Sequence, residues 1–203
     1  MKKKGLAISL VFALSVPLCI CAAAYATCGY HFKGTWFGEY YYVDDRSDGY
    51  GELADAAIEA WNDAVEFEGD GTLDIDLIET TDGDSMKTRI EVSPLDRGAD
   101  GIAGFTYYLD VDSSGVWSYI NFGGYPNKNY QAASTVINRT YTDNYTDAKT
   151  QNVIMHEIGH AFGLSHSSTT SDDGALMYKS ITSVSRLRTP QEDDVNGVRD
   201  IYE

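Results

Sequence analysis

The sequence predicts an α+β domain in which a β-sheet is backed by helices, and three observations lead to this class. The chain has 203 residues, of which 43% are apolar and 12% aromatic, which is enough for one packed core and too little for two full domains. Two segments carry apolar residues at helical spacing, and short β-prone runs separated by turn residues fill the region between them. A strand, a helix, a run of strands and two closing helices are the order expected of a single α+β domain.

The predicted sheet is built from short β-prone runs. The first is the aromatic segment TWFGEYYYV at residues 35–43, and the others alternate or run apolar between Gly, Asp, Asn and Pro. These further strands are expected at residues 73–78, 88–92, 102–109, 116–122 and 133–138. The chain has no repeat, and its four prolines do not form a linker, so we expect one domain.

Three helices are predicted. The first covers residues 51–65, where the apolar residues recur at helical spacing and form a core face: Leu53, Ala57, Ile58, Trp61 and Val65. The second covers residues 147–164, with Thr146 as its N-cap and Gly163 near its C-terminal end. The third covers residues 190–202, with a proline and three acidic residues in its first turn, where the helix dipole favours negative charge.

The N-terminal segment is typical of a secretory signal peptide. Residues 2–4 are lysines, and residues 6–24 carry no charge. Ala24-Tyr25-Ala26 supplies the small residues that signal peptidase requires, so cleavage is expected after Ala26 and residues 27–203 form the mature domain. The alternative is an uncleaved membrane anchor, since about 19 apolar residues can just span a bilayer.

Removal of this segment changes the charge and the cysteine content. Three lysines and no acids are lost, so the formal net charge moves from -16 to -19. Nucleic-acid binding needs a basic patch, and anionic membrane surfaces repel an acidic protein, so we expect neither as a partner of the mature chain. Cys19 and Cys21 leave with the signal, and Cys28 then has no partner for an internal disulfide.

The second predicted helix carries a metal-binding pattern. Residues 156–166, HEIGHAFGLSH, fit H-E-x-x-H-x-x-G-x-x-H without departure. His156 and His160 are one helical turn apart, so both imidazoles can face one ion at about 2.0–2.1 Å. Gly163 can adopt a left-handed conformation that ends the helix, and His166 can then return to the same ion. The sequence therefore predicts a zinc site with His156, His160 and His166 as its ligands.

The same pattern indicates catalysis. Three imidazoles leave a fourth position on zinc open to water, and Glu157 can accept the proton of that water as a general base. A lone histidine on a helix is usually a packed or solvated residue, but three of the four histidines of this chain fall in one motif. Two other function classes stay open: an inactive zinc-binding adhesin or interaction domain, and a zinc hydrolase that acts on something other than peptides.

These residues resemble the metzincin clan of zinc endopeptidases, and within it the matrixin family of matrix metalloproteinases and their bacterial relatives. Met177, eleven residues after His166, lies in the segment ALMY, which is similar to the Met-turn of the clan. The family's methionine lies beneath the three histidines. Tyr178 directly follows the methionine, as in matrixins, and the closing stretch is similar to the C-terminal helix of the family, so the specific resemblance covers residues 153–202.

The resemblance implies a metzincin-like catalytic domain: a twisted mixed β-sheet of about five strands with an active-site helix, a backing helix and a C-terminal helix. It implies a secreted, extracellular zinc endopeptidase, which we expect to be a monomer. The alternative within this fold is an inactive zinc-binding adhesin. A protein or peptide substrate would lie extended along an edge strand, here residues 102–109, and residues 178–188 would wall the S1' specificity pocket.

The chain also departs from the family pattern. Vertebrate matrixins hold a second, structural zinc with further histidines, but only His31 remains here, so that site is not expected. The acidic loops 96–101 and 110–115 could bind Ca²⁺ as family members do, or could be plain turns. No typical propeptide follows the signal. Cys28-Gly29 shares two residues with the family's inhibitory cysteine motif, so Cys28 is either a thiolate that caps the zinc or a free surface thiol.

Two sequons for N-glycosylation begin at Asn138 and Asn144. They matter only in a eukaryotic secretory pathway.

Overall fold

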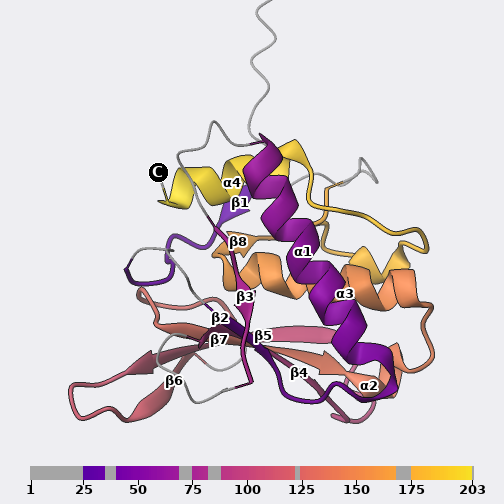
Figure 1. Ribbon diagram of the computed structural model, residues 1–203, viewed down its shortest axis with the longest axis horizontal. Helices are drawn as coiled ribbons and strands as arrows, with labels where there is room; N and C mark the ends of the chain where they lie inside the picture. The colour runs from indigo at the N-terminus through magenta and orange to yellow at the C-terminus, as the bar shows by residue number, and fades with distance from the viewer. Residues whose placement is uncertain are drawn as a thin grey trace, which may run out of the picture.

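A mixed sheet forms one layer of the molecule (Figure 1). The computed structural model describes residues 25–34, 40–68, 75–81, 88–121, 124–167 and 175–202. Within them the sheet has six strands, which lie in the order β3 (Ile78–Glu79), β2 (Tyr40–Val43), β4 (Thr88–Leu95), β7 (Ala132–Asn138), β5 (Gly104–Val111) and β6 (Trp117–Asn121). The first four strands of this order are parallel, and β5 is antiparallel to both of its neighbours. The predicted α+β class and mixed sheet are confirmed, and the six strands are one more than the number of about five that the resemblance implied.

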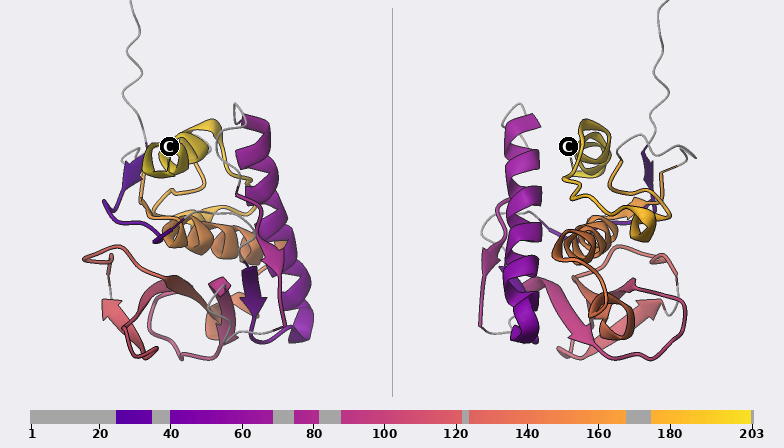
Figure 2. Two further views of the ribbon diagram at one scale, coloured as in Figure 1. Left: turned by 60° about the vertical axis from the view of Figure 1, so that its left-hand side comes forward. Right: turned by 90° about the vertical axis from the view of Figure 1, so that its right-hand side faces the viewer.

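Three long helices lie on one side of this sheet. The helix α3 (Asp147–Ala161) runs across the sheet, and α4 (Glu192–Tyr202) lies on the opposite side of α3 (Figure 2). The helix α1 (Tyr50–Glu68) stands beside both, and a single turn of helix, α2 (Arg139–Thr142), follows β7 directly. The helix with the metal-binding pattern is therefore enclosed from three directions.

The predicted core face of α1 packs against α3. Trp61 has no exposed surface, and its indole N–H donates to the carbonyl oxygen of Met155 at 2.9 Å. Its ring also meets the Phe162 ring edge-on, with centroids 5.2 Å apart. A buried Trp whose N–H has a partner adds apolar contact without leaving a polar group unsatisfied. This pair of contacts fixes α1 along the buried helix.

One predicted strand, residues 73–78, is largely wrong. Residues 69–74 lie outside the described part of the chain, and the strand that forms is only Ile78–Glu79. The side-chain amide of Asn62 accepts from the Leu77 N–H at 3.2 Å and donates to the Leu77 carbonyl at 3.1 Å. A side chain of α1 therefore satisfies the backbone groups that a neighbouring strand would bind, while Leu77 itself is buried.

Other predicted boundaries shift by a few residues. The first predicted strand begins at Tyr40, and residues 35–39 are outside the described ranges. The strand predicted at 102–109 begins at Gly104, and the active-site helix ends at Ala161 rather than at residue 164. The last helix begins at Glu192, after the proline that was expected inside its first turn.

A second, two-stranded sheet was not predicted. The strand β1 (Ala26–Thr27) pairs antiparallel with β8 (Leu164–Ser165) beside α4. The hydroxyl of Tyr25 also donates to the Asp200 carboxylate of α4. Cleavage after Ala26 stays a prediction, and it would remove Tyr25 and Ala26 from these contacts. No helix among the described residues has the length and the apolar character needed to cross a bilayer.

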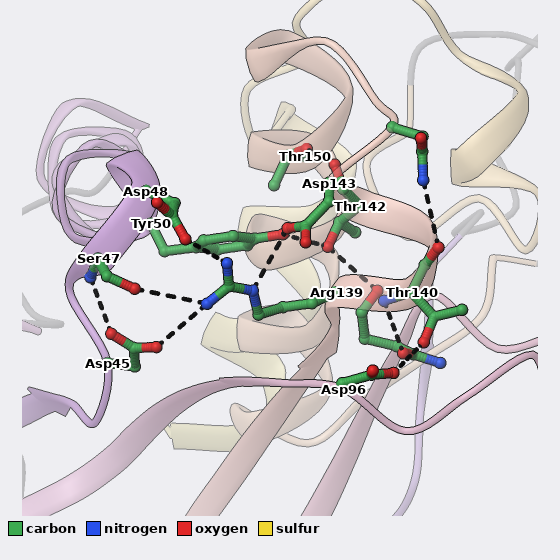
Figure 3. A network of polar contacts seen from close by, with 12 residues as sticks. Asp45, Ser47, Asp48, Tyr50, Asp96, Arg139, Thr140, Thr142, Asp143 and Thr150 are labelled. Carbon is green, nitrogen blue, oxygen red and sulfur yellow. Dashed lines mark hydrogen bonds and ion pairs between the residues drawn. The ribbon is translucent and has the colours of Figure 1, made fainter.

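A network around Arg139 joins the end of β7 to the loop that precedes α1 (Figure 3). Its guanidinium binds the carboxylates of Asp45 at 3.2 Å and Asp143 at 3.4 Å, and it also pairs with Asp48. It lies 5.3 Å from the centre of the Tyr50 ring, a cation–π distance. The network fixes the segment that leads into α3.

The first sequon has a structural role. Asn138 is 1% exposed, and its amide nitrogen donates to the carbonyl oxygens of Gly98 and Ile102, both at 3.0 Å. That nitrogen is the atom to which a glycan would be attached, so the folded protein leaves no room for one. Asn144 is exposed.

Candidate metal centre

The structure brings the three predicted histidines together. One ligand atom from each of His156, His160 and His166 lies within 4.8 Å of the others. The ring centroids of His156 and His160 are 4.7 Å apart, and those of His160 and His166 are 4.8 Å apart. His156 and His160 are buried on α3, while His166 follows the end of the helix and is partly exposed.

The turn that returns His166 depends on Gly163. This residue has φ 99°, a left-handed conformation that favours glycine, as predicted. A Cβ at position 163 would also lie 2.6 Å from the carbonyl oxygen of Tyr30, too close for any side chain. The N–H of Gly163 bonds to the His160 carbonyl at 2.9 Å, which closes the last turn of the helix.

Tyrosine hydroxyl groups satisfy the last carbonyl groups of α3. Helix ends leave such carbonyls without intrahelical donors, and a buried end needs partners from elsewhere. The donors come from β5, the β6–β7 connection, α4 and the N-terminal segment, in the pairs Tyr108 Oη to His160 O at 3.1 Å, Tyr130 Oη to Ala161 O at 2.8 Å, Tyr202 Oη to Phe162 O at 2.9 Å and Cys28 N to Gly163 O at 2.8 Å. Four successive carbonyls are thus held by segments far apart in the sequence.

Carbonyl groups orient two of the imidazoles. The Nδ1 atom of His156 donates to Leu176 O at 2.8 Å, and the Nδ1 atom of His160 donates to Leu164 O at 2.8 Å. A carbonyl oxygen only accepts, so the proton of each neutral ring is on Nδ1 and the Nε2 lone pair is free for a metal. Burial lowers the pKa of His160 to about 4 and lowers those of His156 and His166, so all three are neutral at pH 7.

This donor set fits zinc. Zinc takes imidazole nitrogen readily, and a catalytic zinc site keeps three protein ligands with one position open. Three neutral imidazoles within 4.8 Å, two of them held by backbone carbonyls, meet these requirements. Among the residues that the structure describes, this is the only group of three or more metal-ligating side chains whose ligand atoms lie close enough together to hold one ion.

The Met-turn lies directly beneath the helix. A Cβ at Gly159 of α3 would overlap the Met177 sulfur atom, so the two segments are in close contact. The buried carboxylate of Asp194, on α4, accepts from the N–H groups of Leu176 at 3.0 Å and Met177 at 3.1 Å. Since the Leu176 carbonyl binds His156, Asp194 fixes the turn that orients this histidine.

Glu157 is buried beside the histidines and contacts β5. The Thr106 hydroxyl lies 2.9 Å from the Glu157 Oε2 atom and 2.9 Å from the Glu157 carbonyl oxygen. Burial raises the pKa of Glu157 to about 8, and the bond from Thr106 opposes this rise. A cation held by the adjacent histidines would favour the carboxylate form further. The predicted base therefore lies at the site with a donor on one of its oxygens.

A cleft of about 350 Å³ opens over these residues. Its lining comes from the segment around β5, the segment that precedes β7 and the site itself: Ile102, Gly104, Phe105, Thr106, Tyr108, Gly124, Tyr125, Glu157, His160 and His166. Tyr125 lies at its rim, where the hydroxyl accepts from the His166 N–H at 3.3 Å. The cleft is mostly apolar with polar groups at its base, which is the character of a ligand site.

The strand expected to form the edge, residues 102–109, lies between β7 and β6 in the sheet order. Next to the histidines, however, strand β6 does not cover this strand. Strand β6 pairs with β5 only from Tyr108 to Val111, so Gly104 to Thr106 pair with β7 alone among the described strands. The side of β5 that faces the cleft thus keeps an unpaired stretch.

The two acidic loops give no support to the Ca²⁺ expectation. The Asp112 carboxylate accepts from the N–H groups of Ser114 at 2.8 Å and Val116 at 3.0 Å, and Asp96 accepts from Gly98 N at 2.9 Å. These bonds close tight turns within the loops, the alternative stated for them.

Cys28 and His31 lie outside the group of three histidines. The Cys28 thiol donates to Tyr30 O at 3.1 Å, and burial raises its pKa, which disfavours the thiolate that a zinc cap requires. The His31 ring bonds to Phe32 O at 2.7 Å and to the Asn129 amide at 3.0 Å.

The sequence motif identifies the histidines and Glu157, but it does not identify three of the residues that hold these side chains in place. Gly104, Thr106 and Asp194 reach the site from β5 and α4, and no short spacing connects them with the motif. From the sequence, the acidic first turn of α4 indicates only a favourable interaction with the helix dipole.

Comparison with known proteins identifies one family. A family model described as Matrixin matches residues 46–203. Interstitial collagenase from Bos taurus is 42% identical over 62 residues, which are 30% of this chain and 12% of the collagenase. Metalloendoproteinase 1 from Glycine max is 44% identical over 52 residues, 26% of this chain and 16% of that protein. Matrix metalloproteinase-27 from Homo sapiens is 45% identical over 51 residues, 25% of this chain and 9% of that protein. The matched stretch is thus a small part of each relative.

Proposed function

The chain belongs to the matrixin family of zinc metalloendopeptidases, and from this premise we propose that it is a secreted enzyme that hydrolyses peptide bonds with Glu157 as general base and with zinc on His156, His160 and His166. The observation that carries the proposal is the convergence of three neutral imidazoles beside one buried carboxyl group, which lines a cleft together with His160 and His166.

The chemistry divides between the metal and the chain. Zinc supplies Lewis acidity, which makes water a nucleophile near neutral pH and polarises a carbonyl group. Glu157 takes the proton of the attacking water and returns it to the leaving amine. The carbonyls of Leu176 and Leu164 hold two imidazoles in the tautomer that binds a metal through Nε2.

The open stretch of β5 is suited to hold a peptide. The backbone of Gly104, Phe105 and Thr106 borders the cleft and pairs with β7 on its other side only. An extended substrate could add to this stretch as a strand, held by main-chain hydrogen bonds. The substrate would then pass directly over Glu157.

The proposed S1' wall, residues 178–188, is anchored to α3. The buried amide of Asn152 donates to Arg186 O at 2.8 Å and accepts from Arg188 N at 2.7 Å. This pair of bonds holds the far end of the segment against the helix that carries the histidines, which is what a fixed pocket wall requires.

Further features of the proposed protein follow from the sequence and the family. They are export by a signal peptide at residues 1–26, a single catalytic domain at residues 27–203, an extracellular location and a monomeric state. The substrate is a protein or peptide rather than a nucleic acid.

A peptide library tests the proposal against its alternatives. The purified protein is incubated with unfolded protein and with the library, with and without a zinc chelator, and zinc is then added back. We expect cleavage that the chelator abolishes and zinc restores. Binding of zinc without any cleavage would instead support the inactive adhesin, and hydrolysis of non-peptide esters or amides alone would support a different zinc hydrolase.

A further inference from the structure

Two residues of β5 contact the Glu157 side chain. Gly104 and Thr106 are alternate residues of one strand, so they face the same side of the sheet, which here is the side covered by α3. Both lie within contact distance of Glu157, while Phe105 between them faces away. The strand that borders the substrate cleft therefore also touches the proposed base.

Gly104 provides the space. A Cβ at this position would lie 2.7 Å from Glu157 Cγ, 2.8 Å from Glu157 Oε1 and 2.7 Å from Val153 Cγ1, distances that real Cβ atoms do not show. Gly104 is not among the described residues with positive φ, so its backbone conformation does not require glycine. The absence of a side chain is what lets the carboxyl group lie against the strand.

Thr106 provides the hydrogen bond. It is 5% exposed, and its hydroxyl is 2.9 Å from Glu157 Oε2. A hydroxyl carries one proton and two lone pairs, so it can donate to the carboxylate or accept from the protonated carboxyl while donating to the Glu157 carbonyl, also 2.9 Å away. The contact therefore persists on both sides of a proton transfer.

A general base must be held within hydrogen-bond reach of the proton that it accepts. A glutamate has three side-chain torsions, so its carboxyl group needs contacts of its own to be held in one position. We propose that Gly104 and Thr106 are positioning residues for Glu157: Gly104 leaves the volume that the carboxyl group fills, and the Thr106 hydroxyl fixes one carboxyl oxygen. The inference rests on the proposed function of Glu157 as general base.

The test compares two substitutions at one position. Thr106→Val keeps the shape and removes the hydroxyl, whereas Thr106→Ser keeps the hydroxyl and removes a methyl group. We expect Thr106→Val to lower kcat about 10- to 100-fold, the loss typical of a misplaced reacting group, with KM and zinc affinity unchanged. Thr106→Ser restores most of this loss. Activity is measured per bound zinc on a fluorogenic peptide taken from the library, and zinc affinity by competition with a chelating dye.

Thr135→Val is the matched control. Thr135 is a buried threonine that lies opposite Thr106 in the neighbouring strand β7, but its hydroxyl donates to Glu91 O at 2.9 Å. It reports what the loss of a buried threonine hydroxyl does to the sheet alone, and we expect it to leave kcat at the wild-type value. Gly104→Ala provides a second test if Thr106→Val does not fold, and this substitution should lower kcat without loss of zinc.

The outcomes separate this inference from the proposed function. Wild-type kcat in Thr106→Val, equal losses in the Val and Ser variants, or weaker zinc binding in Thr106→Val would each overturn the positioning role and leave the proposed function unaffected. If Thr106→Val does not fold, wild-type kcat in a folded Gly104→Ala protein overturns it. If the wild-type protein shows no chelator-sensitive cleavage, the proposed function fails first.

Discussion

At the scale of single residues, the contact between Gly159 and the Met-turn shows how closely the helix approaches the segment beneath it. Gly159 has an ordinary helical backbone conformation and lies between His156 and His160 along the helix. A Cβ there would overlap the Met177 sulfur and lie 3.1 Å from the Trp61 ring. Any side chain at this position must therefore push the Met-turn away from the histidines.

Gly159→Ala is predicted to destabilise the protein. Glycine to alanine inside a helix usually stabilises by about 1 kcal/mol, but overpacking of a core costs about 1–3 kcal/mol, and here the second effect should prevail. Chemical denaturation measures the free energy of unfolding. The same substitution in a Met177→Ala background provides the control, where most of the cost should disappear. A stability gain from Gly159→Ala in the wild-type background would contradict the close packing.

The ligands and the base were predictable because their geometry is local. His156, Glu157 and His160 lie on one helix, and Gly163 permits the turn to His166, so spacing alone relates them. Their supports were not predictable. Which strand brings a hydroxyl to Glu157, and which turn brings a carbonyl to His156, depends on tertiary packing between segments about 20 to 50 residues apart.

At the scale of elements, the end of α3 is determined by its partners as much as by its own sequence. The prediction extended the helix to residue 164, but it ends at Ala161. Its last carbonyls then accept from three tyrosine hydroxyls and from the Cys28 N–H. These donors hold the turn from which the Leu164 carbonyl reaches His160 and the chain returns with His166.

Removal of one of these donors should cost stability. Tyr130→Phe keeps the buried ring and leaves the Ala161 carbonyl without its hydroxyl donor, so we expect a loss of about 1–3 kcal/mol in the free energy of unfolding. Thermal and denaturant unfolding measure it. Tyr30→Phe is the matched control, because Tyr30 is 38% exposed, and it should change stability little. Equal stability of both variants would show that the tyrosine bonds do not support the helix end.

The elements with long apolar patterns were predicted well, and those stabilised by a single distant contact were not. The amphipathic pattern of residues 51–65 gave α1, whose Trp61, Ile58 and Val65 are buried. The run at residues 73–78 has the composition of a strand, yet the Asn62 amide takes both backbone groups of Leu77. The hydrophobic pattern of a segment indicates which side chains are buried, but it does not indicate which groups form hydrogen bonds with the backbone.

At the scale of the whole molecule, the site depends on the way in which the helices and the sheet enclose α3. The sheet contributes Thr106, α4 contributes Asp194, and the Met-turn lies between α3 and α4. Cys28, the cysteine in the described part of the chain, forms no disulfide, so packing and polar contacts hold these layers. Tyrosine is prominent among these contacts, with 15 residues in the chain.

Buried tyrosines predict an alkaline limit to stability. Burial raises the pKa of Tyr50 to about 12 and raises that of four others above its usual range: Tyr41, Tyr108, Tyr130 and Tyr202. Tyrosines in the unfolded chain ionise near pH 10, so the folded state retains protons that the unfolded state loses. Stability should be unaffected below about pH 10 and fall as the pH rises further.

Tyrosinate absorbance measured together with unfolding tests this limit. The five buried tyrosines should ionise only as the circular dichroism signal is lost. Ionisation of all tyrosines near pH 10 with the fold intact would contradict the burial of these hydroxyls.

In the proposed mechanism, zinc on three histidines and the Glu157 carboxylate together hydrolyse peptide bonds. Glu157→Gln tests it most directly, because it keeps the shape of the side chain and removes its basicity. We measure kcat per bound zinc for the wild type, for Glu157→Gln and for Glu59→Gln, a matched change at an exposed position of α1. We expect one bound zinc in every protein, unchanged kcat in Glu59→Gln and a fall in kcat of about 100- to 10,000-fold in Glu157→Gln. Wild-type kcat in zinc-loaded Glu157→Gln would contradict it.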